Sequence, residues 1–149
     1  MAKELLKKYL ETKQWNYLEK DNILKVDVSG NEFSWNSFLK VDEEYSFCYF
    51  SVLPAMVPQE RRELFSSLLH QINCQIWFGD FEFVLTGDNA GQVRLRTSTF
   101  LPPVATEETL LQLADLSINM NMAAMNFYGP VLMKALYGNS LNAEDYLSD

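Results

Sequence analysis

The spacing of apolar residues along the first third of the chain predicts a helix followed by strands. Four apolar residues near the N-terminus repeat at helical spacing, so residues 1–13 are expected to form an amphipathic helix with Leu5, Leu6, Tyr9 and Leu10 on one face. Three strand-like runs follow, at 23–28, 33–41 and 45–53. The third run is aromatic on both parities, which predicts a central position in a sheet.

The middle of the chain predicts a second helix and a hairpin. A helix is expected from Pro58 to Asn73, and its wheel places His70 opposite the apolar stripe, in solvent. Runs at 75–85 and 92–100 then predict two paired strands. A register that keeps apolar residues opposite apolar residues puts five side chains of the first strand toward a helix layer: Trp77, Gly79, Phe81, Phe83 and Leu85. The same register leaves four charged side chains on the open face: Asp80, Glu82, Arg94 and Arg96.

A long helix with two apolar faces is expected to begin after the N-cap Thr106. One face holds Leu110, Leu111, Ala114, Ile118, Met122 and Met125, and the other holds Leu113, Leu116, Met120, Ala123 and Phe127. A narrow polar stripe separates them, formed by Gln112, Asp115, Asn119 and Asn126. The second face needs a further helix or a second subunit to cover it, and intramolecular core and partner interface are about equally supported.

Gly129-Pro130 is expected to end that helix, and a short helix at 131–137 then closes at Gly138. The acidic tail, 139–149, is expected to be loosely ordered. Together these elements predict an α+β fold in one domain: helix, three strands, helix, two strands, helix, with the helices packed on one face of an antiparallel sheet.

Composition narrows the classes of partner. The 149 residues are 48% hydrophobic and include ten Phe, seven Tyr and three Trp, which disfavours disorder. The net charge of −8 disfavours nucleic-acid binding. The first 13 residues are net positive, so they are compatible with a membrane-surface helix, but docking on the same domain is favoured. We expect no signal peptide, because the first eight residues are charged and contain no apolar core, and no membrane span, because no apolar run is long enough. Cys48 and Cys74 are expected to be reduced, in a cytoplasmic protein.

No arrangement of residues in the sequence is typical of catalysis. The chain has one histidine, no glycine-rich phosphate loop and no paired CxxC. We therefore expect no enzyme, no catalytic residue, no metal site and no cofactor.

The four charged residues of the open face have two interpretations. They can form a ladder of ion pairs on a solvated sheet face, or Arg94 and Arg96 can be anchors for carboxylates of a partner. The ladder is favoured, because enough acidic residues to satisfy both arginines lie beside them.

Several short segments match a known family. They are Tyr49, Ser51, Leu53-Pro54, Val57-Pro58, Arg62, Asn73, Gly79-Asp80-Phe81-Glu82, Gly91 to Thr97, Asn121, Tyr128-Gly129-Pro130 and Tyr137-Gly138. Over residues 15–138 the chain resembles the YbjN-like family of bacterial sensory transduction regulators, especially its small cyanobacterial members. The resemblance implies a type III secretion chaperone-like fold, a homodimer and a role without catalysis.

Two functions are compatible with these expectations. The leading hypothesis is a chaperone- or adaptor-like module that binds a protein client and dimerises through the second face of the long helix. The alternative is a regulatory domain that senses a small molecule. Its ligand would lie on a concave sheet face with Tyr49, Asn73, Glu82, Arg94 and Arg96 as polar anchors.

Overall fold

The computed structural model describes residues 2–147, with Asp42 and Glu43 described by their backbone alone. Met1 of the predicted first helix and residues 148–149 of the predicted tail lie outside this range. The helices are α1 (Ala2–Thr12), the short 3₁₀ helix η1 (Gln59–Arg61), α2 (Arg62–Asn73), α3 (Glu107–Tyr137) and α4 (Glu144–Leu147). The strands are β1 (Leu18–Lys20), β2 (Ile23–Ser29), β3 (Ser34–Glu43), β4 (Ser46–Val52), β5 (Asp80–Phe83) and β6 (Val93–Phe100).

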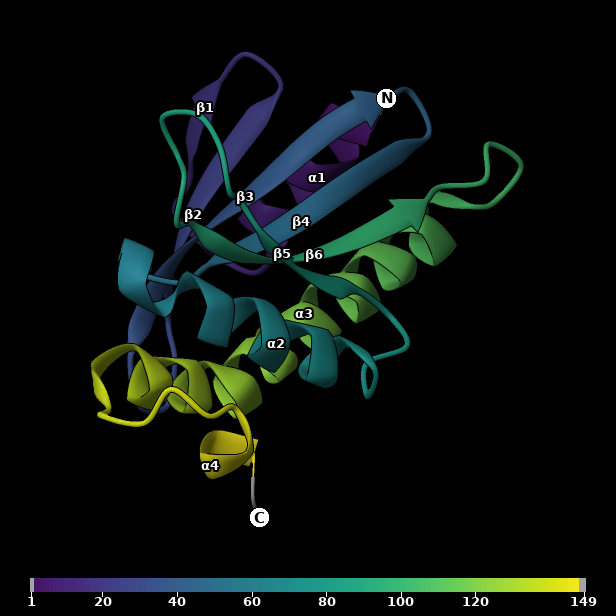
Figure 1. The fold of residues 1–149 in the computed structure, drawn as a ribbon. Coiled ribbons are helices and arrows are strands. Elements are labelled where there is room, and N and C mark those ends of the chain that lie inside the picture. Colours follow the sequence, from purple (N-terminus) through teal and green to yellow (C-terminus); the bar gives the residue numbers. More distant parts are fainter. Residues whose placement is uncertain (1, 148–149) are drawn as a thin grey trace.

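The strands form one antiparallel sheet in the order β1-β2-β3-β4-β6-β5, and the helices cover one of its faces (Figure 1). This confirms the predicted α+β fold with helices on one side. The short strand β1 was not predicted from the sequence, because its three residues are all exposed and carry no apolar alternation.

Alternation of side chains decides which face each strand buries. On β3, Trp35, Ser37 and Leu39 are buried beneath the helices, while Ser34, Asn36 and Lys40 are exposed on the open face. Strand β4 lies between β3 and β6, which confirms its predicted central position.

Helix α1 lies against α3 on the covered side of the sheet, with its four predicted apolar residues buried. The expectation that this helix docks on its own domain is therefore confirmed. Helix α2 buries its predicted stripe against β5, and His70 is exposed, as predicted. No helix in the described part of the chain is both long and apolar enough to cross a membrane.

Strand β5 is shorter than the predicted run at 75–85, and only Asp80–Phe83 pair with β6. The chain leaves α2 through a turn at 74–79, in which Ile76 is buried but Trp77 is 85% exposed. The prediction that Trp77 faces the helices was wrong, because strand alternation does not extend into this turn. Leu85, which lies beyond the end of β5, is likewise exposed.

Helix α3 does not end at Gly129-Pro130, which corrects the sequence prediction. Proline removes one backbone hydrogen bond and costs roughly 3 kcal/mol inside a helix. The helix continues because the turns that follow are tightly packed: Leu132, Ala135 and Leu136 are buried in the core. Burying each of the two leucines stabilises the helical continuation by about 1.5–3 kcal/mol, which offsets the proline.

The segment 139–147 is more ordered than the sequence predicted. The guanidinium of Arg61 donates to the backbone oxygens of Ala135 and Ser140, at 2.7 and 2.9 Å, and so joins the end of α3 to this segment. Ala143 is buried beside the core, and the Tyr146 hydroxyl donates to the same Ser140 oxygen. The apolar residues of the tail, together with one arginine, therefore hold it against the domain.

Candidate interaction surfaces

The four charged residues predicted for the open face lie together there. Asp80 is directly opposite Arg96 in the register, and Glu82 is directly opposite Arg94. The carboxylate of Glu82 contacts both arginines, at 2.8 Å from Nε of Arg94 and 3.1 Å from Nε of Arg96. Glu82 thus holds two guanidiniums side by side.

Arg94 is further held by an aromatic ring. Its guanidinium carbon lies 5.1 Å from the centroid of the Phe50 ring on β4, which is the geometry of a cation–π contact. With Glu82 at its edge and Phe50 at its face, the Arg94 side chain is fixed in orientation, although it remains partly exposed.

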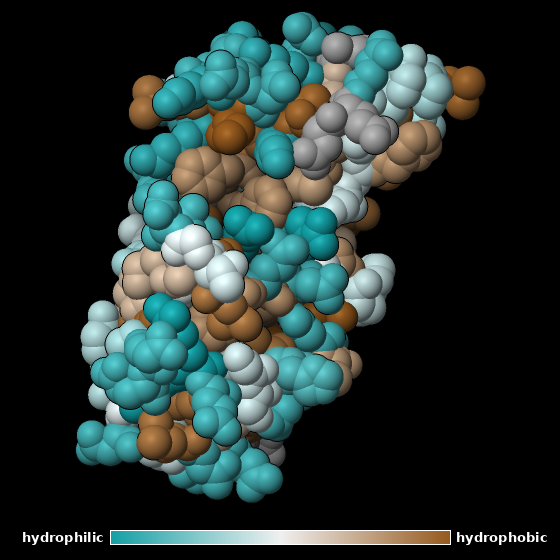
Figure 2. Space-filling model, turned by 45° about the horizontal axis from the view of Figure 1, so that its top comes forward, coloured by the Kyte–Doolittle hydropathy of each residue, from teal (hydrophilic) through white to brown (hydrophobic). Residues whose placement is uncertain are grey.

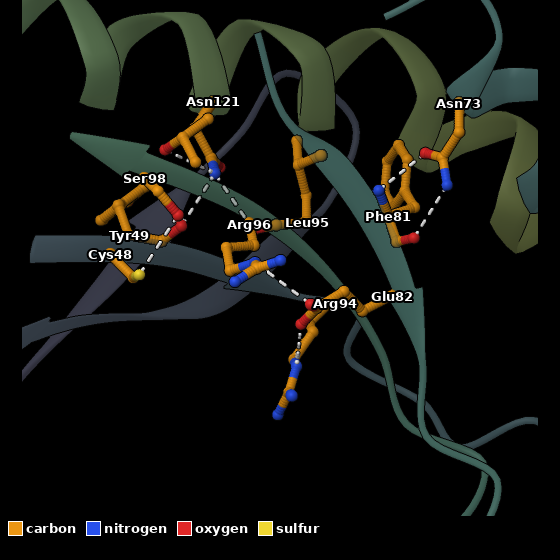
Figure 3. A network of polar contacts seen from close by, with 11 residues as sticks. Cys48, Tyr49, Asn73, Phe81, Glu82, Arg94, Leu95, Arg96, Ser98 and Asn121 are labelled. Carbon is orange, nitrogen blue, oxygen red and sulfur yellow. Dashed lines mark hydrogen bonds and ion pairs between the residues drawn. The ribbon is translucent and has the colours of Figure 1, made fainter. Parts of the chain in front are cut away.

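Tyr49 lies on the opposite side of the sheet from the arginines, buried beneath the helices. Figure 3 shows Asn121 and α3 on one side of the strands, with Glu82 and Arg94 on the other. Burial raises the pKa of Tyr49 to about 12, and its hydroxyl makes no hydrogen bond within the described residues. This tyrosine is therefore part of the core and does not face the surface that carries the arginines.

Asn73 covers the outer edge of β5. Its side-chain oxygen accepts from the Phe81 amide at 2.7 Å, and its side-chain nitrogen donates to the Phe81 carbonyl at 2.9 Å (Figure 3). The side chain therefore substitutes for a neighbouring strand at this rung of the ladder. Asn73 limits strand addition at this edge, a role that its position at a helix end did not reveal.

The five polar anchors expected from the sequence do not surround one pocket. Glu82, Arg94 and Arg96 lie together on the open face, Tyr49 lies beneath the sheet and Asn73 lies at its edge. The small-molecule pocket proposed from these five residues is therefore not formed.

A buried polar network joins α3 to the sheet, and the sequence pattern did not predict it. Asn121 has no exposed surface, and its side-chain nitrogen donates to the carbonyls of Tyr49 and Leu95, both at 3.1 Å (Figure 3). Its oxygen accepts from Ser51 at 2.6 Å, and Ser51 in turn accepts from the Trp35 indole at 3.0 Å. The helical wheel could have indicated this buried contact. It places the Asn121 amide between residues of the buried apolar face of α3, outside the polar stripe.

The two apolar faces predicted for α3 differ in their burial. The first face is covered: Leu110, Ala114, Ile118 and Met125 are buried, and Leu111 and Met122 are half-buried. The second face is more open: Leu116, Ala123 and Phe127 are exposed, the first and last by 58% and 72%, while Leu113 and Met120 are half-buried. Leu113 packs against the core, and the described residues leave the rest of this face partly or largely uncovered.

Trp77 extends the open face of α3. A hollow of about 320 Å³ lies between the turn at 74–79 and the helix, lined by Trp77, Met120, Ala123 and Phe127 among others. We refer to Leu113, Leu116, Met120, Ala123, Phe127 and Trp77 together as the α3 strip. Figure 2 shows one face of the molecule, on which brown and tan side chains lie in areas bordered by teal ones.

Four of the six residues of the α3 strip lie on a stretch of sequence without charge. From Leu116 to Met133 the helix contains no acidic and no basic residue, although the chain as a whole carries a net charge of −8. An exposed apolar surface flanked by amides and lacking charge is typical of a protein interface.

Comparisons with known proteins identify the fold. The structure is similar to YbjN from E. coli, a proposed transcription regulator, with a TM-score of 0.64, 12% sequence identity and coverage of 85% of this chain and 90% of that one. It is also similar to an uncharacterised protein from Methanothermobacter thermautotrophicus, with a TM-score of 0.55, 10% identity and coverage of 93% and 100%. No family model matches the sequence, and no curated protein matches it. The chain therefore has the YbjN-like fold that its sequence motifs indicated.

Proposed function

We propose that this protein is a non-catalytic, cytoplasmic protein-interaction module that forms a homodimer through the α3 strip and binds a protein client. The observation that carries the proposal is the exposure of large apolar side chains along one uncharged helix face and the turn beside it: Phe127 and Leu116 of α3 are 72% and 58% exposed, and Trp77 of the turn is 85% exposed. The comparison with a proposed transcription regulator agrees with a regulatory role for such a module.

The shape of the strip favours a second copy of this chain as its occupant. Ala123 is a small residue, with Met120 one turn before it and Phe127 one turn after it. If two α3 helices cross antiparallel at Ala123, each Met120 lies opposite the partner's Phe127, and the small central residue allows the helices to approach closely.

Charge and area support the same arrangement. Two copies that each carry −8 repel one another least where they meet on an uncharged surface. Aromatic side chains bury about 150–250 Å² each, so Trp77 and Phe127 alone supply a substantial part of the roughly 800 Å² that each partner contributes to a stable interface.

Sedimentation velocity tests the dimer. The chain of 17.2 kDa is expected to sediment as a dimer, and Met120→Glu is expected to give a folded monomer, because it places a charge at the centre of the contact. Val104→Glu is the matched control, since Val104 is 95% exposed on a loop outside the strip and its substitution adds the same charge. A monomeric wild type, or a Met120→Glu variant that remains dimeric, would refute the proposal.

A further inference from the structure

The open face of the sheet differs in charge from the rest of the molecule. The register assigns to this face five basic side chains, Lys20, Lys25, Lys40, Arg94 and Arg96, and three acidic ones, Asp27, Asp80 and Glu82, among those described. This face is net positive, whereas the whole chain carries a net charge of −8. The face therefore attracts acidic groups, which the rest of the surface repels.

One row of this face crosses all six strands. Directly opposed residues run in the order Leu18, Lys25, Phe38, Phe50, Arg96 and Asp80. Two aromatic rings therefore lie side by side on β3 and β4, with a lysine on one flank and an arginine on the other. Both rings are partly exposed, because no helix covers this side of the sheet.

The arginines on this flank keep donors free for a ligand. Glu82 contacts each of them at Nε, and the terminal guanidinium nitrogens of Arg94 and Arg96 make no hydrogen bond within the described residues. Since Glu82 and Phe50 hold Arg94 in place, its outer N–H groups are oriented before any partner arrives. The guanidinium fork suits a carboxylate in two-point contact.

We propose that this face binds an extended acidic segment of a client protein, with an apolar side chain over Phe38 and Phe50. Lys25 and Arg96 are separated by three strand spacings, which is about 14 Å. In an extended peptide, residues i, i+2 and i+4 point to the same side, and i to i+4 spans about 13–14 Å. Carboxylates four residues apart therefore reach Lys25 and Arg96 together, with the apolar residue midway between them.

A peptide fits this face better than a nucleic acid. A polyanion would bring a charge at every unit of its backbone toward the three carboxylates of the face and the acidic remainder of the chain. A short peptide brings its charges only where the cations lie. The inference rests on the proposed function only in that the client is a protein, and it is independent of the dimer.

Fluorescence anisotropy tests the inference with a labelled peptide that contains Glu-Thr-Leu-Thr-Glu. Lys25→Gln and Arg96→Gln are each expected to weaken binding by about threefold to tenfold, the range of single exposed charge contacts. Lys134→Gln, which removes an exposed cation from α3, is the matched control and is expected to leave binding unchanged. A peptide with its two acids adjacent is expected to bind more weakly, because it cannot reach both flanks.

Glu82→Gln separates binding from a structural role of the ion pairs. This substitution removes the negative charge that competes with a ligand carboxylate, so affinity for the peptide is expected to rise, whereas a purely structural ladder predicts no gain. Equal binding to wild type and to the Lys25→Gln/Arg96→Gln double variant would overturn the proposal, as would tighter binding of a uridine decamer than of the peptide. Met120→Glu is expected to bind the peptide normally, so that failure of the dimer and failure of the client site are distinguishable.

Discussion

Replacement of Asn121 by alanine tests whether the buried polar network holds α3 on the sheet. The Asn121 side chain is completely buried and bonds to two adjacent strands, through the Tyr49 carbonyl on β4 and the Leu95 carbonyl on β6. It also accepts the hydroxyl proton of Ser51, which connects it to Trp35 on β3. Alanine removes these three contacts and a longer one of 3.4 Å to the Thr97 hydroxyl, and it leaves the buried Ser51 hydroxyl without its acceptor.

The magnitude follows from the number of bonds lost. The three shorter hydrogen bonds contribute about 1 kcal/mol each, and the buried Ser51 hydroxyl left without an acceptor adds to the loss, so the free energy of unfolding is expected to fall by about 3–4 kcal/mol. For a domain of this size, such a change lowers the melting temperature by roughly 10 °C. It is also a large fraction of the roughly 5–15 kcal/mol by which domains are stable.

Urea unfolding followed by tryptophan fluorescence measures the change. Asn119→Ala is the control, because Asn119 is exposed on the same helix and its replacement changes helix propensity by the same amount. The difference between the two variants therefore isolates the buried network. A difference below about 1 kcal/mol, within the range of one ordinary hydrogen bond, would refute this account of Asn121.

Three further predictions follow from single contacts. Asn73→Ala should make the Phe81 amide exchange with deuterium faster, since its acceptor is lost, while core amides of α3 keep their protection. The Tyr9 hydroxyl, which donates to Asp115, holds the pKa of that carboxyl below its ordinary value of 3.8. This contribution to stability is present at neutral pH and is lost as pH falls through the lowered pKa, so Asp115→Asn should lower the urea midpoint at pH 7 but much less at pH 2. Gly79→Ala should destabilise the fold by about 1–3 kcal/mol in urea, because the new methyl group would lie 2.5 Å from a backbone oxygen of β6; an unchanged midpoint would contradict this.

Periodicity predicted the elements whose environment is uniform along their length. The stripe of α2, the alternation of β3 and the buried face of α1 each repeat one pattern against one neighbour, so local spacing was sufficient. The hairpin register was also predictable, because a slip of one residue would have moved Phe81 and Leu95 into solvent.

Predictions from short segments of sequence failed where packing against a distant segment decided the conformation. Pro130 favours the end of a helix, but burial of Leu132 and Leu136 outweighs it. Trp77 is apolar and follows a buried residue, yet it lies in a turn and is exposed. The network around Asn121 needs groups from three strands and one helix, and no short window of sequence contains them.

The sequence by itself determined most of the helices and strands, the side of the sheet to which the residues of β3, β5 and β6 point, and the uncharged second face of α3. These properties depend on the spacing of residues along the chain, which the sequence contains in full. Only the tertiary structure decided that Tyr49 and Asn73 lie apart from Arg94 and Arg96, and that Lys25 shares a row with Arg96 across four strands. Such relations depend on strand order and on which face the helices cover, and both are set by the burial of apolar surface over the whole chain.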